Sequence, residues 1–462
     1  MGARPRRARA RTNVDAARQV AFGALRRVVD EDAYLNLALA RLRDEAGISG
    51  RDAAFATELA AGTARMQGAY DAVLDSCVRG GVAQLQPEVA VALRMGAHQL
   101  LAMRVPSHAA VGTTVELVRA AVGERPVRLA NAVMRAVGQH TLDAWIDVCA
   151  PARDSDLFGH LAVRFSHPRW VVEEFARTVG AGAGLEALLA ADNDPPTVTL
   201  AVRPGLADVA DLLDPSTGTV TAGRWSPYAA VLSSGDPGAM ETVRDGSVGV
   251  QDEGSQLAAL ALVNAAVSGR DTRWLDLCAG PGGKAAMLTG AARTRGAVLV
   301  AAERMEHRAR LVRSSLRGFK AAGTVVCVDG TRAAWPAAAF DRVLVDVPCS
   351  GLGALRRRPE ARWRRTPADV DKLVVLQRSL LDTAFDAVRP GGVVAYVTCT
   401  PVKAETRGVV DAVRRARADV REEDARALLP EVPHLGDGPH LQLWPHVHGT
   451  DAMFVSMLRR DG

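Results

Sequence analysis

Five short apolar runs alternate with helical stretches in the C-terminal half of the chain, and this alternation limits the possible folds more than any other feature. The runs have the length of strands and lie at Trp274–Cys278, Ala297–Ala302, Thr324–Val328, Arg342–Val347 and Val393–Thr398. The helical patterns between most of them are Lys284–Ala292, Met305–Ala322 and Ala368–Val388. Parallel strands need helical crossovers of this kind, so the pattern predicts a doubly wound, mainly parallel sheet. We expect residues 241–462 to form this Rossmann-like α/β domain, with Leu441–Trp444 and Met453–Leu458 as an antiparallel edge hairpin.

The rest of the chain divides where proline becomes frequent. Three prolines lie in residues 13–150, against nineteen in residues 151–462. Apolar residues recur at helical spacing in the first of these segments, which predicts an all-α domain over 13–140. We expect a linker over 141–165 and a small α+β, RRM-like, RNA-binding domain over 166–240, with Thr197–Val202 as a strand. A multidomain chain is what a length of 462 residues favours.

Composition excludes several classes of protein. With 48% hydrophobic and 24% charged residues the chain is globular rather than disordered. No run approaches the roughly 18 apolar residues of a membrane span, and no apolar stretch follows the basic N-terminus. The six cysteines lack CxxC spacing, which argues against a disulfide scaffold or zinc ribbon. We therefore expect a cytoplasmic monomer without a metal, in which His446 and His448 belong to a structural turn.

The basic charge of the chain is concentrated at its N-terminus. Lys and Arg number 57 against 52 Asp and Glu, a net charge of +5. Met1–Thr12 holds five arginines and no acid, so the remaining residues are neutral in sum. We expect this tail to be disordered, with nonspecific RNA contact and mere solubilisation as equal alternatives.

A glycine-rich loop follows the first strand of the α/β region. It runs Cys278-Ala279-Gly280-Pro281-Gly282-Gly283-Lys284 and leads into a helix, where backbone N–H groups can approach a ligand. Acids end the next three strands, at Glu303, Asp329 and Asp346. Because the carboxyl ends of parallel strands line the ligand crevice, this pattern predicts a nucleoside-cofactor site. The glycine spacing alone also allows an NAD-dependent dehydrogenase.

Two cysteines stand at the ends of neighbouring strands. Cys349 follows the fourth strand and Cys399 the fifth. A thiolate that adds to C6 of cytosine makes C5 nucleophilic, so that C5 can accept a methyl group before the thiolate leaves. Asp346 is placed to stabilise such an adduct near N3 of the base. The residues themselves do not say which cysteine is the nucleophile.

Five motifs carry a family resemblance. LDLCAGPGGKA, DVPCSGLGALRRRPEARW, YVTCTP, VQDEGSQLAA and PHVHGTDAMFV resemble the Sun/Fmu family of RNA cytosine-C5 methyltransferases. The segment 13–140 resembles the NusB-like domain of antitermination proteins. A fusion of the two resembles the bacterial members of the family that act on 16S rRNA, which implies rRNA as partner and S-adenosylmethionine as cofactor.

The resemblance also implies a role for each site residue. Cys399 would be the nucleophile and Cys349 would assist product release. Cys278–Lys284 would hold S-adenosylmethionine, with Glu303 on the ribose, Asp329 near the adenine and Asp346 between cofactor and base. Two positions depart from the usual pattern: Glu303 replaces the usual Asp, and Ala285 replaces a Ser or Thr.

An arginine-rich segment directly follows the Cys349 motif. Arg356–Arg365 contains six arginines, one acid and one tryptophan. Guanidinium groups pair with phosphate and tryptophan stacks on bases, so we expect RNA contacts there. The expected contact residues are Arg356, Arg357, Arg358, Arg362 and Trp363, and the alternative is a solvated charged loop. Two alternative functions stay open: a tRNA cytosine-C5 methyltransferase, and an antitermination-type RNA-binding protein with an inactive α/β domain.

Overall fold

The chain folds into two compact units. The computed structural model of the protein describes residues 14–462 apart from 214–215, 217, 320–323 and 333, so the Arg-rich tail over 1–12 lies outside the described residues. The helical unit comprises the chain up to Ala176 together with Ala181–Asp194 and Leu355–Arg364. The sheet unit comprises Arg177–Gly180, Pro195–Ala354 and Arg365–Gly462.

The helical unit confirms the all-α expectation for the N-terminal region. Its helices are α1 (Ala16–Glu31), α2 (Leu35–Ala46), α3 (Gly50–Arg65), α4 (Gln67–Cys77), α5 (Pro87–Leu101), α6 (Ser107–Val122), α7 (Val127–Val137), α8 (Leu142–Cys149), α9 (Leu157–Arg164), α11 (Ala183–Ala191), α16 (Ala361–Arg364) and most of α10 (Arg169–Val179). One continuous core of Ala, Val and Leu side chains joins α1 to α8. Asp15 caps α1 by accepting the backbone N–H of Arg18, and Pro87 stands at the first position of α5, where its missing N–H costs nothing.

The expected linker over 141–165 is wrong, because it contains α8 and α9. Each helix begins at a capping side chain: Thr141 accepts the N–H of Ala144, and Asp156 accepts that of Gly159. Trp145 of α8 is buried, and its indole N–H donates to the carbonyl of Val137 at 2.9 Å. Short helices of this kind carry too few periodic positions to stand out in a sequence.

A small antiparallel sheet opens the sheet unit. Its strands are β1 (Val198–Val202), β2 (Val220–Ala222), β3 (Ala229–Leu232) and β4 (Val248–Val250), in the order β2-β3-β1-β4. β1 is the strand expected at Thr197–Val202. The expected bounds of 166–240 do not match this sheet, because α10 and α11 precede it and β4 lies beyond residue 240. Pairing of β4 with β1 is a long-range contact that the sequence pattern does not reveal.

The large sheet confirms the predicted doubly wound architecture. Its strands are β5 (Arg273–Asp276), β6 (Val298–Glu303), β7 (Thr324–Cys327), β8 (Phe340–Asp346), β9 (Val388–Thr398), β10 (Val420–Glu423), β11 (Leu441–Gln442) and β12 (Phe454–Arg460). The order is β10-β12-β9-β8-β5-β6-β7, with β11 paired to β12. β5 to β9 are parallel, and β12 runs antiparallel to β9 and β10. The expected hairpin of β11 and β12 is present. β12 is not an edge strand, because it pairs with β9 on one side and with β10 on the other.

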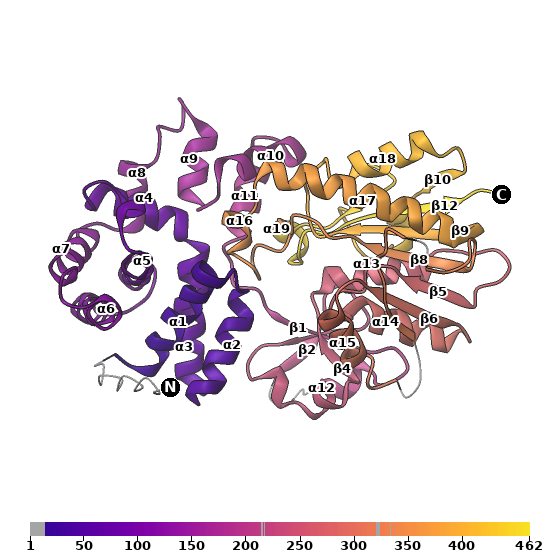
Figure 1. Ribbon diagram of the computed structural model, residues 1–462, viewed down its shortest axis with the longest axis horizontal. Helices are drawn as coiled ribbons and strands as arrows, with labels where there is room; N and C mark the ends of the chain where they lie inside the picture. The colour runs from indigo at the N-terminus through magenta and orange to yellow at the C-terminus, as the bar shows by residue number, and fades with distance from the viewer. Residues whose placement is uncertain (1–13, 214–215, 217, 320–323, 333) are drawn as a thin grey trace, which may run out of the picture. The chain divides into compact units, whose positions relative to one another are not determined.

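Helices cover both faces of this sheet (Figure 1). They are α13 (Glu253–Asn264), α14 (Gly283–Thr294) and α15 (Glu306–Ser315) on one face, and α17 (Pro367–Ala387) and α18 (Arg407–Ala416) on the other. Alternate strand residues face the two cores: Trp274 packs with α13 and α14, and Leu275 with α17. The strand order reverses between β5 and β8, so the loops after these two strands define the crevice in which such folds bind ligands.

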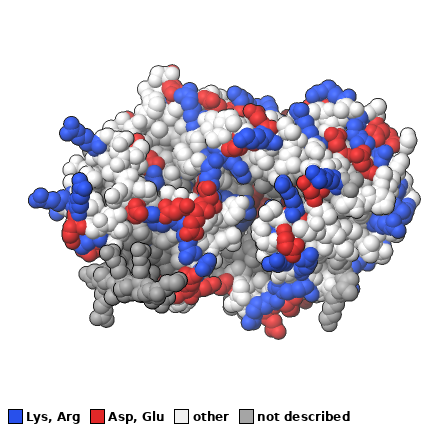
Figure 2. Space-filling model, in the orientation of Figure 1, with Lys and Arg blue, Asp and Glu red and all other residues white. Residues whose placement is uncertain are grey.

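One face of the described residues mixes both signs of charge (Figure 2). On the face drawn in Figure 2, basic and acidic side chains lie interspersed. None of the helices in the described part of the chain has the length and apolar character needed to cross a membrane.

Candidate active site

The glycine-rich loop joins β5 to α14 at the carboxyl edge of the large sheet. Gly282 caps α14 with φ of 97°, and a Cβ there would lie 2.9 Å from the Cα of Val312, so a side chain does not fit. Gly280 also has a positive φ of 57°. Its backbone N–H donates to Oε2 of Glu303 at 3.1 Å. The loop thereby ties the end of β5 to the end of β6.

Glu303 and Asp329 lie at strand ends, as the sequence predicts. Glu303 is 5% exposed, and its second oxygen, Oε1, accepts the backbone N–H of Met305 at 3.0 Å. Each carboxylate oxygen keeps a further lone pair with which it can accept a hydroxyl. Asp329 follows β7, and its Oδ1 accepts both the hydroxyl and the backbone N–H of Thr331. These hydrogen bonds lower the pKa of Asp329.

Asp346 and Lys284 form an ion pair at the switch point of the sheet. Nζ of Lys284 lies 2.8 Å from Oδ2 of Asp346, which ends β8. Burial lowers the pKa of Lys284, but the charge and hydrogen bond of Asp346 outweigh burial and leave the pKa raised. The lysine is therefore held as a cation against the strand-end carboxylate.

Asp276 is a site residue that the sequence analysis did not single out. It ends β5, is fully buried, and neither of its carboxylate oxygens has a hydrogen-bond partner among the described residues. Burial and the nearby charge of Asp346 raise its pKa to about 7. A buried acid without a donor calls for a ligand or a proton. Its place at a strand end was the available signal, since Glu303, Asp329 and Asp346 were found in that way.

The side chains of the two predicted cysteines are in contact. Cys349 follows β8 and Cys399 follows β9, and the register of these parallel strands pairs Asp346 with Val397. The two Sγ atoms are 3.3 Å apart, within hydrogen-bond distance for sulfur, and both side chains are half-buried. The hydrogen bond with Cys399, followed by burial, raises the pKa of Cys349. The raised pKa favours the protonated thiol form of Cys349, which can donate its S–H to the Cys399 sulfur.

The expected RNA contact of Arg362 is wrong. Its side chain is fully buried within the helical unit. Its guanidinium donates to the carbonyls of Arg65, Ser166 and Asp192 and to Oδ1 of Asn193, at 2.8 to 3.2 Å. An arginine that satisfies several buried carbonyls is a structural residue, which the count of charges along the sequence does not reveal.

The other predicted RNA residues differ in exposure. Arg356 is 8% exposed, which also contradicts a surface contact, and Arg357 is half-buried. Arg358 is exposed, with its guanidinium 4.9 Å from the ring centre of Tyr34. Trp363 is half-buried, and its ring packs so closely on Gly68 that a Cβ there would lie 2.4 Å from it. Arg358 is therefore the member of this set that is best placed for phosphate.

His448 belongs to a turn rather than to a metal site. Its Nδ1 accepts the backbone N–H of Trp444, and Nε2 lies 2.9 Å from the carbonyl of Pro433. Both ring nitrogens are thus engaged by backbone, in the short helix α19 (Pro445–His448).

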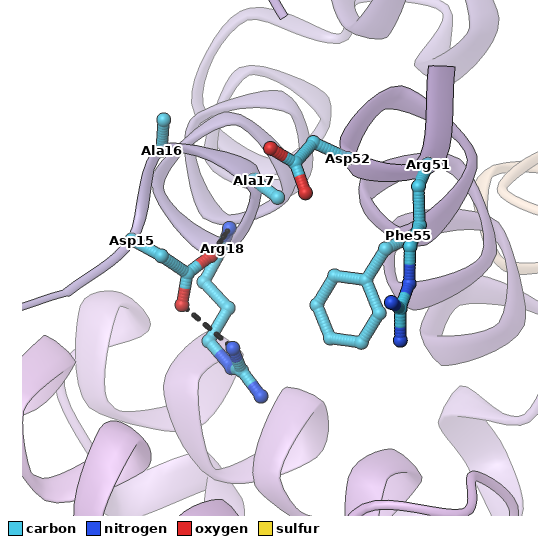
Figure 3. Close-up of a pocket in the computed structure, with 7 residues that line it drawn as sticks. All are labelled: Asp15, Ala16, Ala17, Arg18, Arg51, Asp52 and Phe55. Atoms are coloured by element: carbon cyan, nitrogen blue, oxygen red, sulfur yellow. Dashed lines mark hydrogen bonds and ion pairs between the residues drawn. The ribbon is translucent and has the colours of Figure 1, made fainter. Parts of the chain in front are cut away.

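Two cavities lie apart from these residues. One of about 340 Å³ is in the helical unit, where Arg18 extends between Asp15 and the ring of Phe55 (Figure 3). The other, of about 410 Å³, is in the sheet unit and is lined by Trp225, Tyr228 and residues of α13 and α14. Neither contains a predicted catalytic or cofactor residue.

Comparison with known proteins agrees with this division of the chain. The family model described as 16S rRNA methyltransferase RsmB/F matches residues 264–459, and the NusB family model matches residues 15–139. A protein of Mycobacterium tuberculosis named as a methyltransferase is 49% identical over 97% of this chain and 98% of its own length. The ribosomal RNA small subunit methyltransferase B of Vibrio cholerae is 30% identical over 87% of this chain and 90% of its own.

Solved structures share the fold. PH0851 superposes with a TM-score of 0.80 at 19% identity, over 96% of this chain and 98% of that one. NSun6 from Pyrococcus horikoshii, solved with SFG, superposes with a TM-score of 0.53 at 15% identity, over 64% of this chain and 98% of that one.

Proposed function

Because the chain belongs to the RsmB/F family of 16S rRNA methyltransferases, we propose that it transfers a methyl group from S-adenosylmethionine to C5 of a cytosine in 16S rRNA, through a covalent cysteine–C6 adduct. The observation that carries the proposal is the contact of the Cys349 and Cys399 sulfurs at 3.3 Å, beside the strand-end acid Asp346. Neither a dehydrogenase nor an inactive methyltransferase domain accounts for a pair of half-buried thiols at the crevice.

The crevice fits a cationic nucleoside cofactor. Asp276 offers a buried carboxylate whose oxygens have no hydrogen-bond partner among the described residues. We assign Cys278–Lys284 to its binding, with Glu303 on the ribose and Asp329 near the adenine. S-adenosylmethionine, of which the SFG bound by NSun6 is an analogue, supplies an electrophilic methyl group.

The two cysteines act in different steps of the proposed reaction. The Cys399 thiolate adds to C6, a C–S bond forms, and the electron pair passes to C5, which takes the methyl group. Asp346, held by Lys284, stabilises the adduct near N3. A base, which we assign to the deprotonated Cys349, then takes the C5 proton; the C–H electron pair re-forms the C5–C6 double bond, and Cys399 leaves as the thiolate with the C–S electron pair. Adduct formation consumes the Cys399 thiolate and weakens its hydrogen bond to Cys349, which is the largest cause of the raised Cys349 pKa. Cys349 is thereby easier to deprotonate when the adduct must break down.

Substitution of each cysteine tests these roles. We expect Cys399→Ala to abolish methylation and adduct formation, and Cys349→Ala to accumulate a protein–RNA adduct that denaturing electrophoresis detects. A Cys399→Ala protein that still methylates RNA would contradict the assignment.

Bisulfite sequencing of total RNA from cells with and without the gene tests the reaction and its substrate together. A cytosine in 16S rRNA that is protected only when the gene is present supports the proposal. Protection in tRNA alone would replace rRNA with tRNA as substrate, and no protection together with no S-adenosylmethionine binding would favour an RNA-binding protein without activity.

A further inference from the structure

A buried carboxylate connects the loops that carry the two cysteines. Glu405 lies between β9 and α18 in the sheet unit and is fully buried. Its Oε1 accepts the backbone N–H of Ser350 at 2.8 Å and Nε2 of Gln377 at 3.0 Å. Its Oε2 accepts the hydroxyl of Ser350 at 2.5 Å. Three donors on one carboxylate fix its orientation.

These donors stand on both sides of Cys349. Ser350 is its neighbour in the chain, and Gln377 also donates to the carbonyl of Pro348, its other neighbour, at 2.9 Å. The loop that carries Cys349 is therefore held through Glu405 before and after the cysteine. Arg365 donates to the carbonyl of Ser350 at 3.2 Å and completes the set of backbone contacts.

The same carboxylate reaches the loop that carries Cys399. The hydroxyls of Ser350 and Thr400 lie 2.9 Å apart, and Thr400 adjoins Cys399. A carboxylate only accepts, so Ser350 donates to Glu405 and must accept from Thr400, which in turn accepts the backbone N–H of Val402 at 3.2 Å. The hydrogen bonds run in one direction, from the Cys399 loop to Glu405, and such chains reinforce one another.

The charge of Glu405 acts on the Cys349 sulfur. No described Lys or Arg forms an ion pair with Glu405. Burial raises the pKa of Glu405, and the hydrogen bonds from Ser350 and Gln377 act against that rise and favour the carboxylate. The pKa of Cys349 is raised by the hydrogen bond with Cys399, by burial, and by the negative charges of Glu405 and Asp346. Tyr396 of β9 also faces this region and donates its hydroxyl to the carbonyl of Glu405 at 2.7 Å, and Lys284 is the cation on the Cys399 side. A glutamine at position 405 would fill the same space without burying a charge. The presence of a glutamate there therefore indicates that the charge itself has a function.

We propose that Glu405 is a positioning residue for the methyl transfer: it fixes the loops on either side of the cysteine pair and keeps the thiol proton on Cys349, so that Cys399 acts as the nucleophile. The inference rests on the proposed cytosine-C5 chemistry. It gives a physical reason for different roles of Cys349 and Cys399, which both follow a strand in the sequence and are in contact in the structure.

Variants of the full-length protein separate charge from position. Glu405→Gln keeps the size and removes the charge, and Glu405→Asp keeps the charge and shortens the reach. Ser350→Ala removes one donor and the link to Thr400. Glu422→Gln is the control on the distant strand β10: the Glu422 side chain is also buried and accepts a hydroxyl, from Ser456 at 2.9 Å, but it is paired in addition with Arg414 at 3.0 Å.

Two measurements are needed. The first is iodoacetamide alkylation of Cys349 and Cys399 as a function of pH, resolved by peptide mass spectrometry. The second is methylation and adduct formation on 16S rRNA transcribed with cytidine or with 5-fluorocytidine, whose fluorine blocks breakdown of the adduct. Alkylation needs no RNA, so it reports on the charge even if the proposed reaction is wrong.

We expect Glu405→Gln to lower the midpoint of Cys349 alkylation by about one pH unit and to reduce the methylation kcat about 10- to 100-fold, with KM for RNA changed less than about threefold. Glu405→Asp should retain the wild-type midpoint and still lose about 10-fold in kcat, as should Ser350→Ala. Glu422→Gln should alter neither measurement.

An unchanged alkylation midpoint in Glu405→Gln, together with kcat values for all three site variants within threefold of wild type, would overturn the inference. If Glu405→Gln does not fold, Ser350→Ala and Glu405→Asp decide it by the same kcat criterion. A wild-type protein that neither methylates nor forms an adduct refutes the proposed function instead, and the alkylation midpoints then show separately whether Glu405 controls the thiol proton.

Discussion

At the scale of single residues, Asp276 has the most unusual environment in the crevice. Its carboxyl is fully buried, and its pKa of about 7 lies well above the value of about 3.9 in an unfolded chain. The folded state thus holds a proton that the unfolded state has released. The stability that this protonation contributes is present below pH 4 and is lost as the pH rises through 7.

Asp276→Asn therefore changes the pH dependence of stability. Relative to wild type, we expect the variant to gain up to about 4 kcal/mol in free energy of unfolding between pH 4 and pH 8, at about 1.4 kcal/mol per unit of pKa shift. Urea denaturation at pH 5, 6, 7 and 8 measures the trend. Asp329→Asn is the control, because the pKa of Asp329 is lowered and its own contribution is constant over this range. Parallel curves for Asp276→Asn and wild type would show that Asp276 does not titrate there.

Local signals placed most of the candidate site residues at strand ends, where the structure also has them. A glycine-rich turn after a strand, and acids or cysteines at strand ends, are properties of a few neighbouring residues, and parallel strands bring these ends together. The sequence did not distinguish Cys349 from Cys399, because the contacts that we propose to separate their roles are made by Glu405, Ser350 and Gln377 from separate elements. Asp276 also ends a strand, so the signal that indicated Glu303 and Asp346 was available for it; only the absence of a hydrogen-bond partner among the described residues is a property of the packed structure.

At the scale of elements, the segment Leu355–Arg364 departs furthest from its prediction. It follows the Cys349 motif directly in the chain, yet it packs as part of the helical unit. The backbone N–H of Leu35 donates to Oε1 of Glu360, and Arg364 donates to the carbonyls of Val28 and Ala33. Arginines that find backbone carbonyls to donate to are drawn into the protein instead of forming surface charge. A single sequence does not show where such carbonyls lie.

Arg362→Ala tests the structural role of this segment. Removing a buried guanidinium leaves several carbonyls without a donor, and we expect a loss of about 3–5 kcal/mol in the free energy of unfolding. Arg358→Ala removes an exposed side chain beside Tyr34 and should cost less than about 1 kcal/mol. Chemical denaturation of both variants makes the comparison. A cost below 1 kcal/mol for Arg362→Ala would return this residue to the candidates for RNA contact.

Regular elements were easier to predict than short ones. The five parallel strands and the long helices between them carry enough apolar positions to define their period. The short helices α8 and α9, the three-residue strand β4 and the edge strand β10 do not, because their stability comes from capping side chains or from pairing with distant strands.

At the scale of the whole molecule, the distribution of basic residues depends on which of the two units each segment of the chain joins. The Leu355–Arg364 segment takes much of the predicted basic cluster into the helical unit, where Arg356 and Arg362 are buried. The face drawn in Figure 2 mixes both signs of charge. The five arginines of Met1–Thr12, which lie outside the described residues, form a basic segment without an acid and are a candidate to meet a polyanion.

Deletion of residues 1–12 tests this assignment. Each phosphate that the protein neutralises contributes about 0.7 to 0.9 to the slope of log K against log salt, so we expect the loss of five arginines to flatten that slope by up to about 3.5 to 4.5. RNA affinity should fall at low salt, and turnover at saturating RNA should change little because the cysteine pair and the glycine loop are intact. Filter binding across a series of salt concentrations, with full-length protein carrying the five arginines as glutamines for comparison, measures the slope. If deletion and substitution both leave the slope unchanged, the tail serves solubility, and the RNA must instead be held by the folded units.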